Sequence, residues 1–227
     1  MGEMPATQAK TSDVGHALPA EPEQRLRADT YRLLGHLLAA PPDAQTLAIF
    51  AAAPVSDDDD MLAVAWCMLA TSAGRANPLE VTDEFEALFI GVGRGELMPY
   101  ASWYLTGFLM EKPLAKLRAD LVMLGFERQD NVSEPEDHAA ALCETMALLA
   151  ESGDLESLQT QARFFGDYIG PWMAKFFKEM QASASARFYR AVGQLGEQFI
   201  KTDQRYLEMV ERPDDVPVTG CKTGDSK

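Results

Sequence analysis

Apolar residues recur every three or four positions through almost all of the chain between residues 21 and 209. This spacing puts them on one face of a helix, whereas the alternation of apolar and polar residues that marks a half-buried strand is missing. In the final segment, apolar side chains from Phe188 to Met209 follow steps of three and four residues, which makes one continuous stripe. The pattern predicts an all-α protein of about eight to ten helices.

Prolines, glycines and acidic residues separate the apolar segments. Gly91 and Gly125, for example, follow apolar segments at positions where glycine can close a helix in the left-handed conformation. Helical regularity is poor only between Met98 and Met110. The predicted helices run from about Glu21 to Ala40, Ala44 to Ala52, Met61 to Gly74, Leu79 to Ile90, Pro113 to Leu124, Pro135 to Glu151, Leu155 to Tyr168, Pro171 to Met180 and Ala184 to Met209.

The charge of the chain restricts its partners. Lys and Arg number 20 against 35 Asp and Glu, which gives a net charge of -15. Such a field repels the phosphates of nucleic acids and anionic membrane surfaces, and it attracts basic partners. We therefore expect no nucleic-acid partner.

The first 20 residues contain no apolar run of the kind found in a secretory signal. No later stretch approaches the roughly 20 consecutive apolar residues that cross a bilayer. Cys67, Cys143 and Cys221 are odd in number and widely spaced, so neither a disulfide framework nor a zinc site is predicted. We expect a cytoplasmic protein without membrane insertion.

The segment EPEDH, from Glu134 to His138, places three carboxylates, a proline and a histidine in five residues. Ser133 and Glu136 have the spacing of a capping box, and Pro135 is tolerated in the first turn of a helix. The helix dipole favours negative charge at the same end. These residues alone predict a helix start, with His138 facing the core or a groove beside it and with no metal ligand.

Acidic residues dominate the chain around this segment. Such a run is commonly a solvated face, and the alternative is a docking surface for a short basic peptide. Asp57 to Asp60 form a second acidic run, which we interpret as a helix start rather than a metal site. Between Arg128 and Arg163 the chain has no Lys or Arg but contains Asp130, Glu134, Glu136, Asp137, Glu144, Glu151, Asp154 and Glu156.

The motifs of common enzymes are missing. The loop GVGRGE, beginning at Gly91, lacks the preceding strand of a dinucleotide site and the Lys of a phosphate loop. Serine-nucleophile and two-His zinc motifs are also lacking, and the chain has only 3 His. The 11 Met and the aromatic residues between Met98 and Met110 fit either a filled core or an adaptable peptide groove. No enzyme is expected, and a nucleotide-dependent enzyme that uses GVGRGE is the alternative from another class.

Four stretches, in order, resemble the TorD/DmsD family of cytoplasmic chaperones for molybdoenzymes. Phe85 to Tyr104 is similar to the family's Phe-x-x-Leu-Phe, glycine loop and Pro-Tyr-x-Ser-x-Tyr pattern. Glu134 to His138 matches its Glu-Pro-x-Asp-His signature in every fixed position. Tyr168 to Trp172 and Ala186 to Ile200 correspond to later family segments, so the resemblance spans residues 25–205.

The chain departs from the family pattern at two places. Tyr168 begins a segment where many relatives have His-Leu-x-x-Trp, so a role for that histidine is not carried over. Trp103 occupies a usually aliphatic position. Both departures concern the identity of the client rather than membership in the family.

Residues 1–20 and 212–227 are rich in Pro, Gly, Ser, Thr and charge, so we expect them to form mobile tails. The resemblance implies an all-α fold of two halves, residues 21–130 and 131–211, joined by a hinge near EPEDH. It implies a chaperone that binds the twin-arginine signal peptide and apo form of a molybdenum or tungsten oxidoreductase, such as a formate dehydrogenase or an oxide reductase. The chaperone would keep this client competent for cofactor insertion and delay its export. The alternative is a chaperone of a non-exported nitrate-reductase-type subunit. No cofactor is expected. The resemblance leaves open weak GTP binding, and it leaves open both a monomer and a domain-exchanged dimer.

A signal peptide carries an arginine pair followed by an apolar stretch, so its receptor needs carboxylates beside an apolar groove. With the resemblance in hand, we expect Glu134, Glu136 and Asp137 to face the arginines and His138 to order the hinge. No catalytic or metal-binding residue is predicted. The other predicted contacts with the peptide are Tyr100, Ser102, Trp103, Tyr104 and Trp172.

Overall fold

The computed structural model describes residues 22–54, 60–109, 112–126, 134–151 and 155–209. Within these ranges the chain forms helices and no strand, which confirms the all-α class. The predicted tails lie outside them. The helices are α1 (Pro22–Ala39), α2 (Ala44–Ala51), α3 (Met61–Arg75), α4 (Pro78–Phe85), α5 (Ala101–Thr106), α6 (Lys112–Met123), α7 (Ala139–Glu151), α8 (Leu155–Phe164), α9 (Met173–Ala182) and α10 (Phe188–Glu208), with π-helical turns η1 (Glu86–Ile90) and η2 (Phe165–Ile169).

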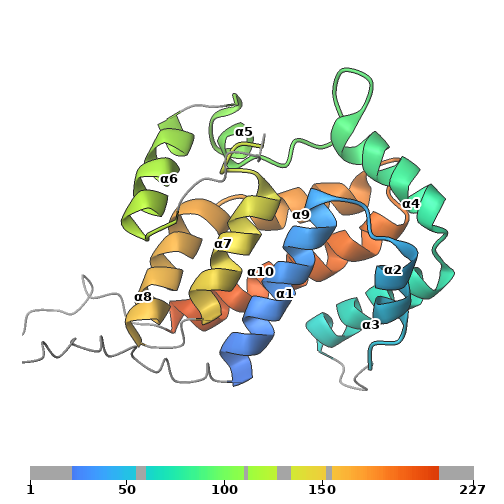
Figure 1. Cartoon of the computed structure of the whole chain (residues 1–227), viewed down its shortest axis with the longest axis horizontal. Helices are drawn as coiled ribbons and strands as arrows, with labels where there is room; N and C mark the ends of the chain where they lie inside the picture. The colour runs from blue at the N-terminus through green and yellow to red at the C-terminus, as the bar shows by residue number, and fades with distance from the viewer. Residues whose placement is uncertain (1–21, 55–59, 110–111, 127–133, 152–154, 210–227) are drawn as a thin grey trace, which may run out of the picture.

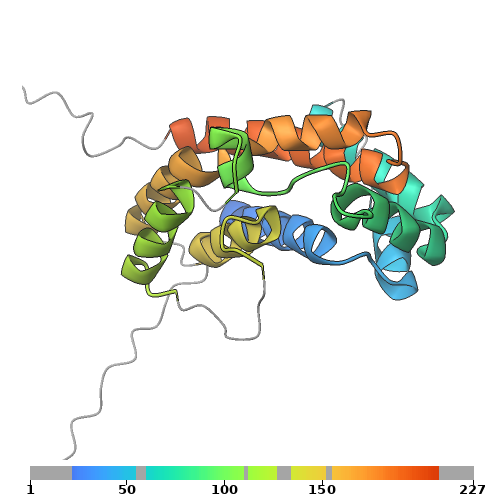
Figure 2. The same cartoon turned by 90° about the horizontal axis from the view of Figure 1, so that it is seen from above.

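The long helices form two layers. Helices α1 and α7 lie side by side in one layer, and α9 and α10 form the other, as Figures 1 and 2 show together. Helix α3 packs against α10 at one end of the molecule, where α2 and α4 also lie, while α6 and α8 lie at the other end. One apolar core runs through the interfaces. Among the described residues, no helix combines the length and the apolar character needed to cross a membrane.

The close approach of α9 and α10 depends on a glycine. A Cβ atom added to Gly196 of α10 would stand 2.5 Å from ring atoms of Phe177 on α9. Phe177 is fully buried, so its ring has no room to withdraw. The apolar stripe predicted for the last helix therefore includes Gly196, and the ring of Phe177 packs directly against its backbone.

The boundaries of most helices confirm the prediction to within two residues, but α7 and α10 do not. Helix α10 begins at Phe188 rather than near Ala184. Helix α7 begins at Ala139 rather than near Pro135, so EPEDH precedes the helix and does not form its first turn. The predicted capping box is wrong in consequence, because Glu136 lies before the helix, and Ser133 lies outside the described residues. Helix α5 was also not predicted, since its 6 residues are too few to show a period.

Two predicted helices change type near their ends. The segments that predicted continuous helices to Ile90 and Tyr168 instead finish in η1 and η2. Such turns add a residue to the helical ring and commonly occur at functional sites. Gly91 ends η1 and Gly125 follows α6, with φ of 60° and 81°, so both have the positive φ that glycine adopts most readily. The ψ of 171° at Gly91 is extended, however, so the left-handed helical cap predicted there is wrong.

The two predicted halves share the core. Helix α1 belongs to residues 21–130 and packs against α7 of residues 131–211, and α3 packs against α10 across the same division. The buried cluster accordingly includes side chains from both halves. The boundary at residues 130 and 131 stays a prediction.

Candidate functional site

The two strongest sequence motifs meet in space. Tyr100 and His138 form an isolated antiparallel bridge, in which Ala101 N donates to the Asp137 carbonyl at 3.0 Å and Ala139 N donates to the Pro99 carbonyl at 2.7 Å. The rings of Tyr100 and His138 pack edge to face, with centroids 5.1 Å apart. We call residues 99–102 together with residues 134–139 the α5–α7 joint.

Two neighbouring side chains of this joint cap two different helices. Asp137 is 1% exposed, and its Oδ2 accepts a hydrogen bond from Ser102 N, in the first turn of α5, at 2.9 Å. His138 Nδ1 accepts one from Ala140 N, in the first turn of α7, at 3.1 Å. Each bond satisfies an amide that a helix start otherwise leaves without a partner. The pair Asp137–His138 therefore fixes α5 relative to α7.

The capping bond also fixes the protonation of His138. Because Nδ1 accepts a hydrogen bond, the neutral ring carries its proton on Nε2. Burial lowers the pKa of His138 below its ordinary value of 6.5, and the negative charges of Glu134 and Asp137 oppose this shift. A second proton would go to Nδ1 and break the cap of α7.

We expect the His138 site to make folding sensitive to acid. A histidine whose pKa is lower in the folded than in the unfolded chain stabilises the fold above the unfolded pKa, and this stability is lost as the pH falls below it. The free energy of unfolding of the parent should therefore fall more between about pH 7.5 and about pH 5.5 than that of His138→Gln. Urea denaturation at both pH values measures the difference. The exposed His36 supplies the control, since His36→Gln should follow the parent, and an identical loss in His138→Gln would contradict the prediction.

Glu134 is the accessible carboxylate of the joint. Its side chain is exposed, and Oε2 accepts a hydrogen bond from Tyr100 Oη at 2.6 Å. Burial raises the pKa of Tyr100 well above its ordinary value, and the bond to Glu134 adds to the rise. The phenol therefore stays protonated and holds one oxygen of Glu134, while the rest of the carboxylate faces solvent.

Glu136 is bound to a cation of the chain itself. Its Oε2 accepts hydrogen bonds from Nε and Nη2 of Arg118 on α6, both at 2.9 Å. Two guanidinium nitrogens on one carboxylate form a strong, directional contact. Arg118 was not predicted as a site residue, because its distance along the chain from Glu136 follows no helical period. The contact between Arg118 and Glu136 links α6 to the α5–α7 joint.

Among the other predicted aromatic residues, Trp103 and Tyr104 are half-buried and Trp172 is buried. The guanidinium of Arg94 lies over the ring of Trp103 at 4.6 Å. Tyr104 packs against Trp172 with ring centroids 5.1 Å apart and donates to Glu179 Oε2 at 2.5 Å. Trp172 is 1% exposed, so it forms the floor beneath Tyr104 rather than a surface.

Helix α5 ends in an apolar surface that the sequence did not mark. Leu105, Phe108 and Leu109 are exposed, Phe108 by 68%. Leu105 lies in the last turn of α5, and Phe108 and Leu109 follow Gly107, whose φ of 83° turns the chain out of the helix. At the other end of this short helix, Ser102 is fully buried, and its Oγ has no hydrogen-bond partner among the described residues. Exposed apolar side chains and the Glu134 carboxylate thus flank one six-residue helix.

The glycine loop folds back on its own helix. Gly91 N donates to the Glu86 carbonyl at 2.7 Å and Leu97 N to the Leu88 carbonyl at 2.8 Å. A Cβ atom on Gly95 would stand 2.5 Å from that Leu88 carbonyl, so only glycine fits. These amides are occupied, whereas a phosphate loop presents free amides to its ligand.

Residues that could hold a metal do not gather in the described part of the chain, where no group of three His, Cys, Asp or Glu side chains has suitable geometry. Asp60 stands directly before α3 as its N-cap, although its side chain forms no capping hydrogen bond. The other three aspartates of that run lie outside the described ranges.

Comparison with known proteins identifies relatives. The family model for the nitrate reductase delta subunit matches residues 56–178. The chain is 32% identical over 139 residues to the chaperone protein TorD of Vibrio cholerae, a match that covers 57% of this chain and 63% of the relative. It is 29% identical over 203 residues to TorD of Shewanella loihica, covering 80% of this chain and 93% of the relative.

One solved structure was also matched. It is that of a putative redox enzyme maturation protein from Archaeoglobus fulgidus, which is 15% identical, has a TM-score of 0.48 and is matched over 86% of this chain and 99% of its own length. The Vibrio match spans less than two thirds of that relative's length. Because the family model covers more than half of the 227 residues and the curated relatives are TorD chaperones, the chain belongs to the TorD/DmsD family.

Proposed function

We propose that this protein is a cytoplasmic, non-enzymatic maturation chaperone that binds the twin-arginine signal peptide of a molybdenum or tungsten oxidoreductase. It keeps the apoenzyme competent for cofactor insertion and delays its export. The observation that carries the proposal is the α5–α7 joint, where the exposed Glu134 and the apolar residues Leu105, Phe108 and Leu109 flank the same helix. An acidic site beside an apolar surface complements an arginine pair followed by an apolar stretch.

The carboxylates of the joint take different parts in this proposal. The exposed carboxylate of Glu134 can accept further hydrogen bonds, and it receives the first arginine. Glu136 receives the second by exchanging the guanidinium of Arg118 for that of the peptide, since both make the same two-nitrogen contact. Asp137 is buried and bound to Ser102 N, so we assign it, with His138, the task of holding the other two in place.

The apolar part of the peptide would lie along α5. Trp103 and Tyr104 are half-buried and border the exposed residues at the end of that helix. Trp172 supports Tyr104 from below, and Tyr100 keeps Glu134 in position. A signal peptide that binds here crosses from charged to apolar contacts within the length of α5, which is about 9 Å.

The test is a calorimetric titration with a synthetic twin-arginine peptide and its Lys–Lys counterpart. We expect Glu134→Gln to weaken binding of the Arg–Arg peptide roughly tenfold or more, because one charge-assisted hydrogen bond contributes about 1.5–3 kcal/mol. Glu144→Gln removes the same charge from an exposed position on α7 and should bind as the parent does. Equal affinity in Glu134→Gln and the parent would rule out the assignment of Glu134.

A second function is favoured by the matched family model, whose description names the delta subunit of nitrate reductase. In that case the protein serves an enzyme subunit that is not exported and needs no arginine pair. The same titration separates the two functions. Equal binding of the Arg–Arg and Lys–Lys peptides, or binding of neither, would favour the second, whereas a preference for Arg–Arg favours the first.

A further inference from the structure

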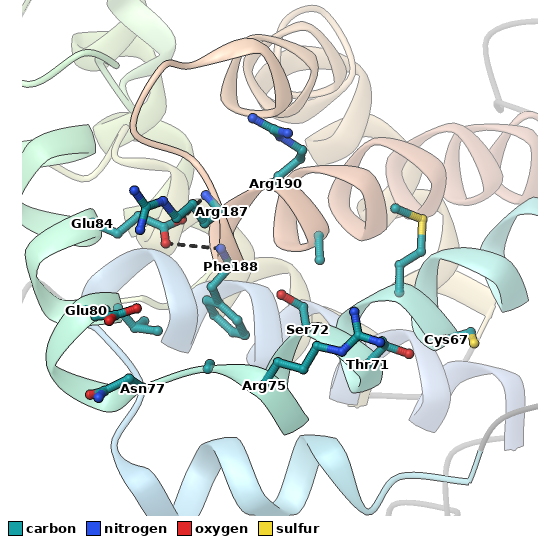
Figure 3. A pocket seen from close by; sticks show the side chains of 14 residues that line it. Cys67, Thr71, Ser72, Arg75, Asn77, Glu80, Glu84, Arg187, Phe188 and Arg190 are labelled. Atoms are coloured by element: carbon teal, nitrogen blue, oxygen red, sulfur yellow. Dashed lines mark hydrogen bonds between the residues drawn. The ribbon is translucent and has the colours of Figure 1, made fainter.

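A pocket of about 480 Å³ lies away from the α5–α7 joint, between α3, the start of α4 and the start of α10. Figure 3 shows arginines from separate elements around it: Arg75 at the end of α3, Arg187 directly before α10 and Arg190 in the first turn of α10. The three side chains are exposed. None of them forms an ion pair within the described part of the chain, in contrast to Arg27, Arg32 and Arg118.

Two of these arginines stand where a helix dipole disfavours a cation, whereas Arg75 lies in the last turn of α3, where the dipole favours one. Arg187 and Arg190 stand at the N-terminus of α10, where the helix dipole is positive and repels a cation. The amides there are already occupied, because Glu84 accepts hydrogen bonds from Arg187 N, Phe188 N and Tyr189 N at 2.8, 3.0 and 2.6 Å. Glu84 and Glu80 are the acidic residues of the lining, so its three arginines leave one positive charge in excess. An anionic ligand would offset this excess of positive charge.

The floor of the pocket indicates that the ligand is not a simple ion. Val81, Phe188 and Ala191 line it and are almost fully buried. Exposed apolar side chains then continue from the pocket along α3: Met68, Val64 and Met61. Steps of three and four residues place them on one face of the helix, over about 10 Å. A ligand that covers this surface needs an apolar side of similar length and negative charge at one end.

We infer that the pocket and this face of α3 bind an acidic amphipathic peptide segment of a partner protein. Its carboxylates pair with Arg75 and Arg190, and its apolar side chains cover Met61, Val64 and Met68. This goes beyond the proposed signal-peptide site, because the preferred charge is opposite and the surface is a different one. The protein would then hold a partner at a basic segment and at an acidic segment at once, which raises the effective concentration of each for its site.

The experiment is fluorescence polarisation with the full-length chain and a labelled twelve-residue peptide that has leucines along one helical face and three glutamates at one end. We expect the Arg75→Glu/Arg190→Glu variant to bind this peptide roughly tenfold or more weakly than the parent. Arg25→Glu/Arg205→Glu makes the same change of charge at exposed positions elsewhere and should retain parental binding. Replacing the peptide's glutamates by glutamines, or its leucines by serines, should also weaken binding.

Each contrary result overturns the inference. Equal binding by the Arg75→Glu/Arg190→Glu variant and the control variant would show that the arginines are not involved. Displacement of the peptide by inorganic pyrophosphate, with no effect of the serine substitutions, would make the pocket a site for a small phosphate ligand instead. The milder Arg75→Gln/Arg190→Gln variant repeats the test without reversing charge. Both variant pairs should bind the signal peptide alike, so failure here is distinct from failure of the proposed function.

Discussion

Replacement of Asp203 by alanine is expected to lower the free energy of unfolding by about 3–5 kcal/mol. Asp203 is 2% exposed and accepts hydrogen bonds from Nε of Arg27, from Nη2 of Arg27 at 3.1 Å and from Tyr31 Oη at 2.7 Å. Without it, the guanidinium of Arg27 remains buried with no opposing charge. Loss of one partner from a buried ion pair is therefore far more costly than the net contribution of the pair.

Urea denaturation followed by circular dichroism measures this loss. Asp29 provides a matched control, because it is exposed and binds Arg32 on the same helix at 3.2 Å, so Asp29→Ala should cost less than about 1 kcal/mol. The double variant Arg27→Met/Asp203→Leu removes both charges and should recover most of the lost stability. A similar loss in Asp203→Ala and Asp29→Ala would contradict the prediction.

The second large effect is expected at Glu84. The residue is 7% exposed, and its carboxylate caps the three amides at the start of α10. Glu84→Ala leaves these amides without partners in a largely dry environment, which should destabilise the fold by roughly 2–4 kcal/mol. Hydrogen exchange should then show faster exchange of the Phe188 and Tyr189 amides.

A Glu80 variant is the control that separates loss of the cap from the general effect of removing a negative charge from α4. Glu80 lies one turn earlier on α4 and is exposed, so Glu80→Ala should change the free energy of unfolding by less than about 0.5 kcal/mol. Glu84→Gln keeps one acceptor oxygen and should fall between the parent and Glu84→Ala. Glu84→Ala with parental stability and parental exchange rates would disprove the capping role.

The sequence predicted the regular part of the fold well. Long periodic segments such as Phe188–Glu208 reveal their buried face through spacing alone, and glycines mark where helices end. Local signals also explain why α2 begins after Asp43, whose side chain accepts from Thr46 N at 2.7 Å. These features depend on residues within one or two helical turns of each other. Interactions over this distance can be recognised from the spacing of residues in a single sequence.

The site was harder to predict, because its bonds join distant parts of the chain. EPEDH has the composition of a helix start, yet α7 begins one residue after it and the carboxylate of Asp137 caps α5 instead. Arg118, which holds Glu136, and the exposed Phe108 carry no local signal. The predicted residues Tyr100 and His138 do meet, but only the resemblance to a family had suggested that their motifs belong together.

The pairing of the first helix with the last has a consequence for synthesis. Arg27 and Asp203 are 176 residues apart in the chain, and α1 otherwise packs on α7. Contacts of such long range form late and slow the folding of a chain. While the ribosome is still adding α10, the part of α1 that contacts α10 and the cation of Arg27 have no final partners. The nascent chain therefore exposes apolar surface of its own until α10 is released, as do the unfinished enzymes that it is proposed to protect.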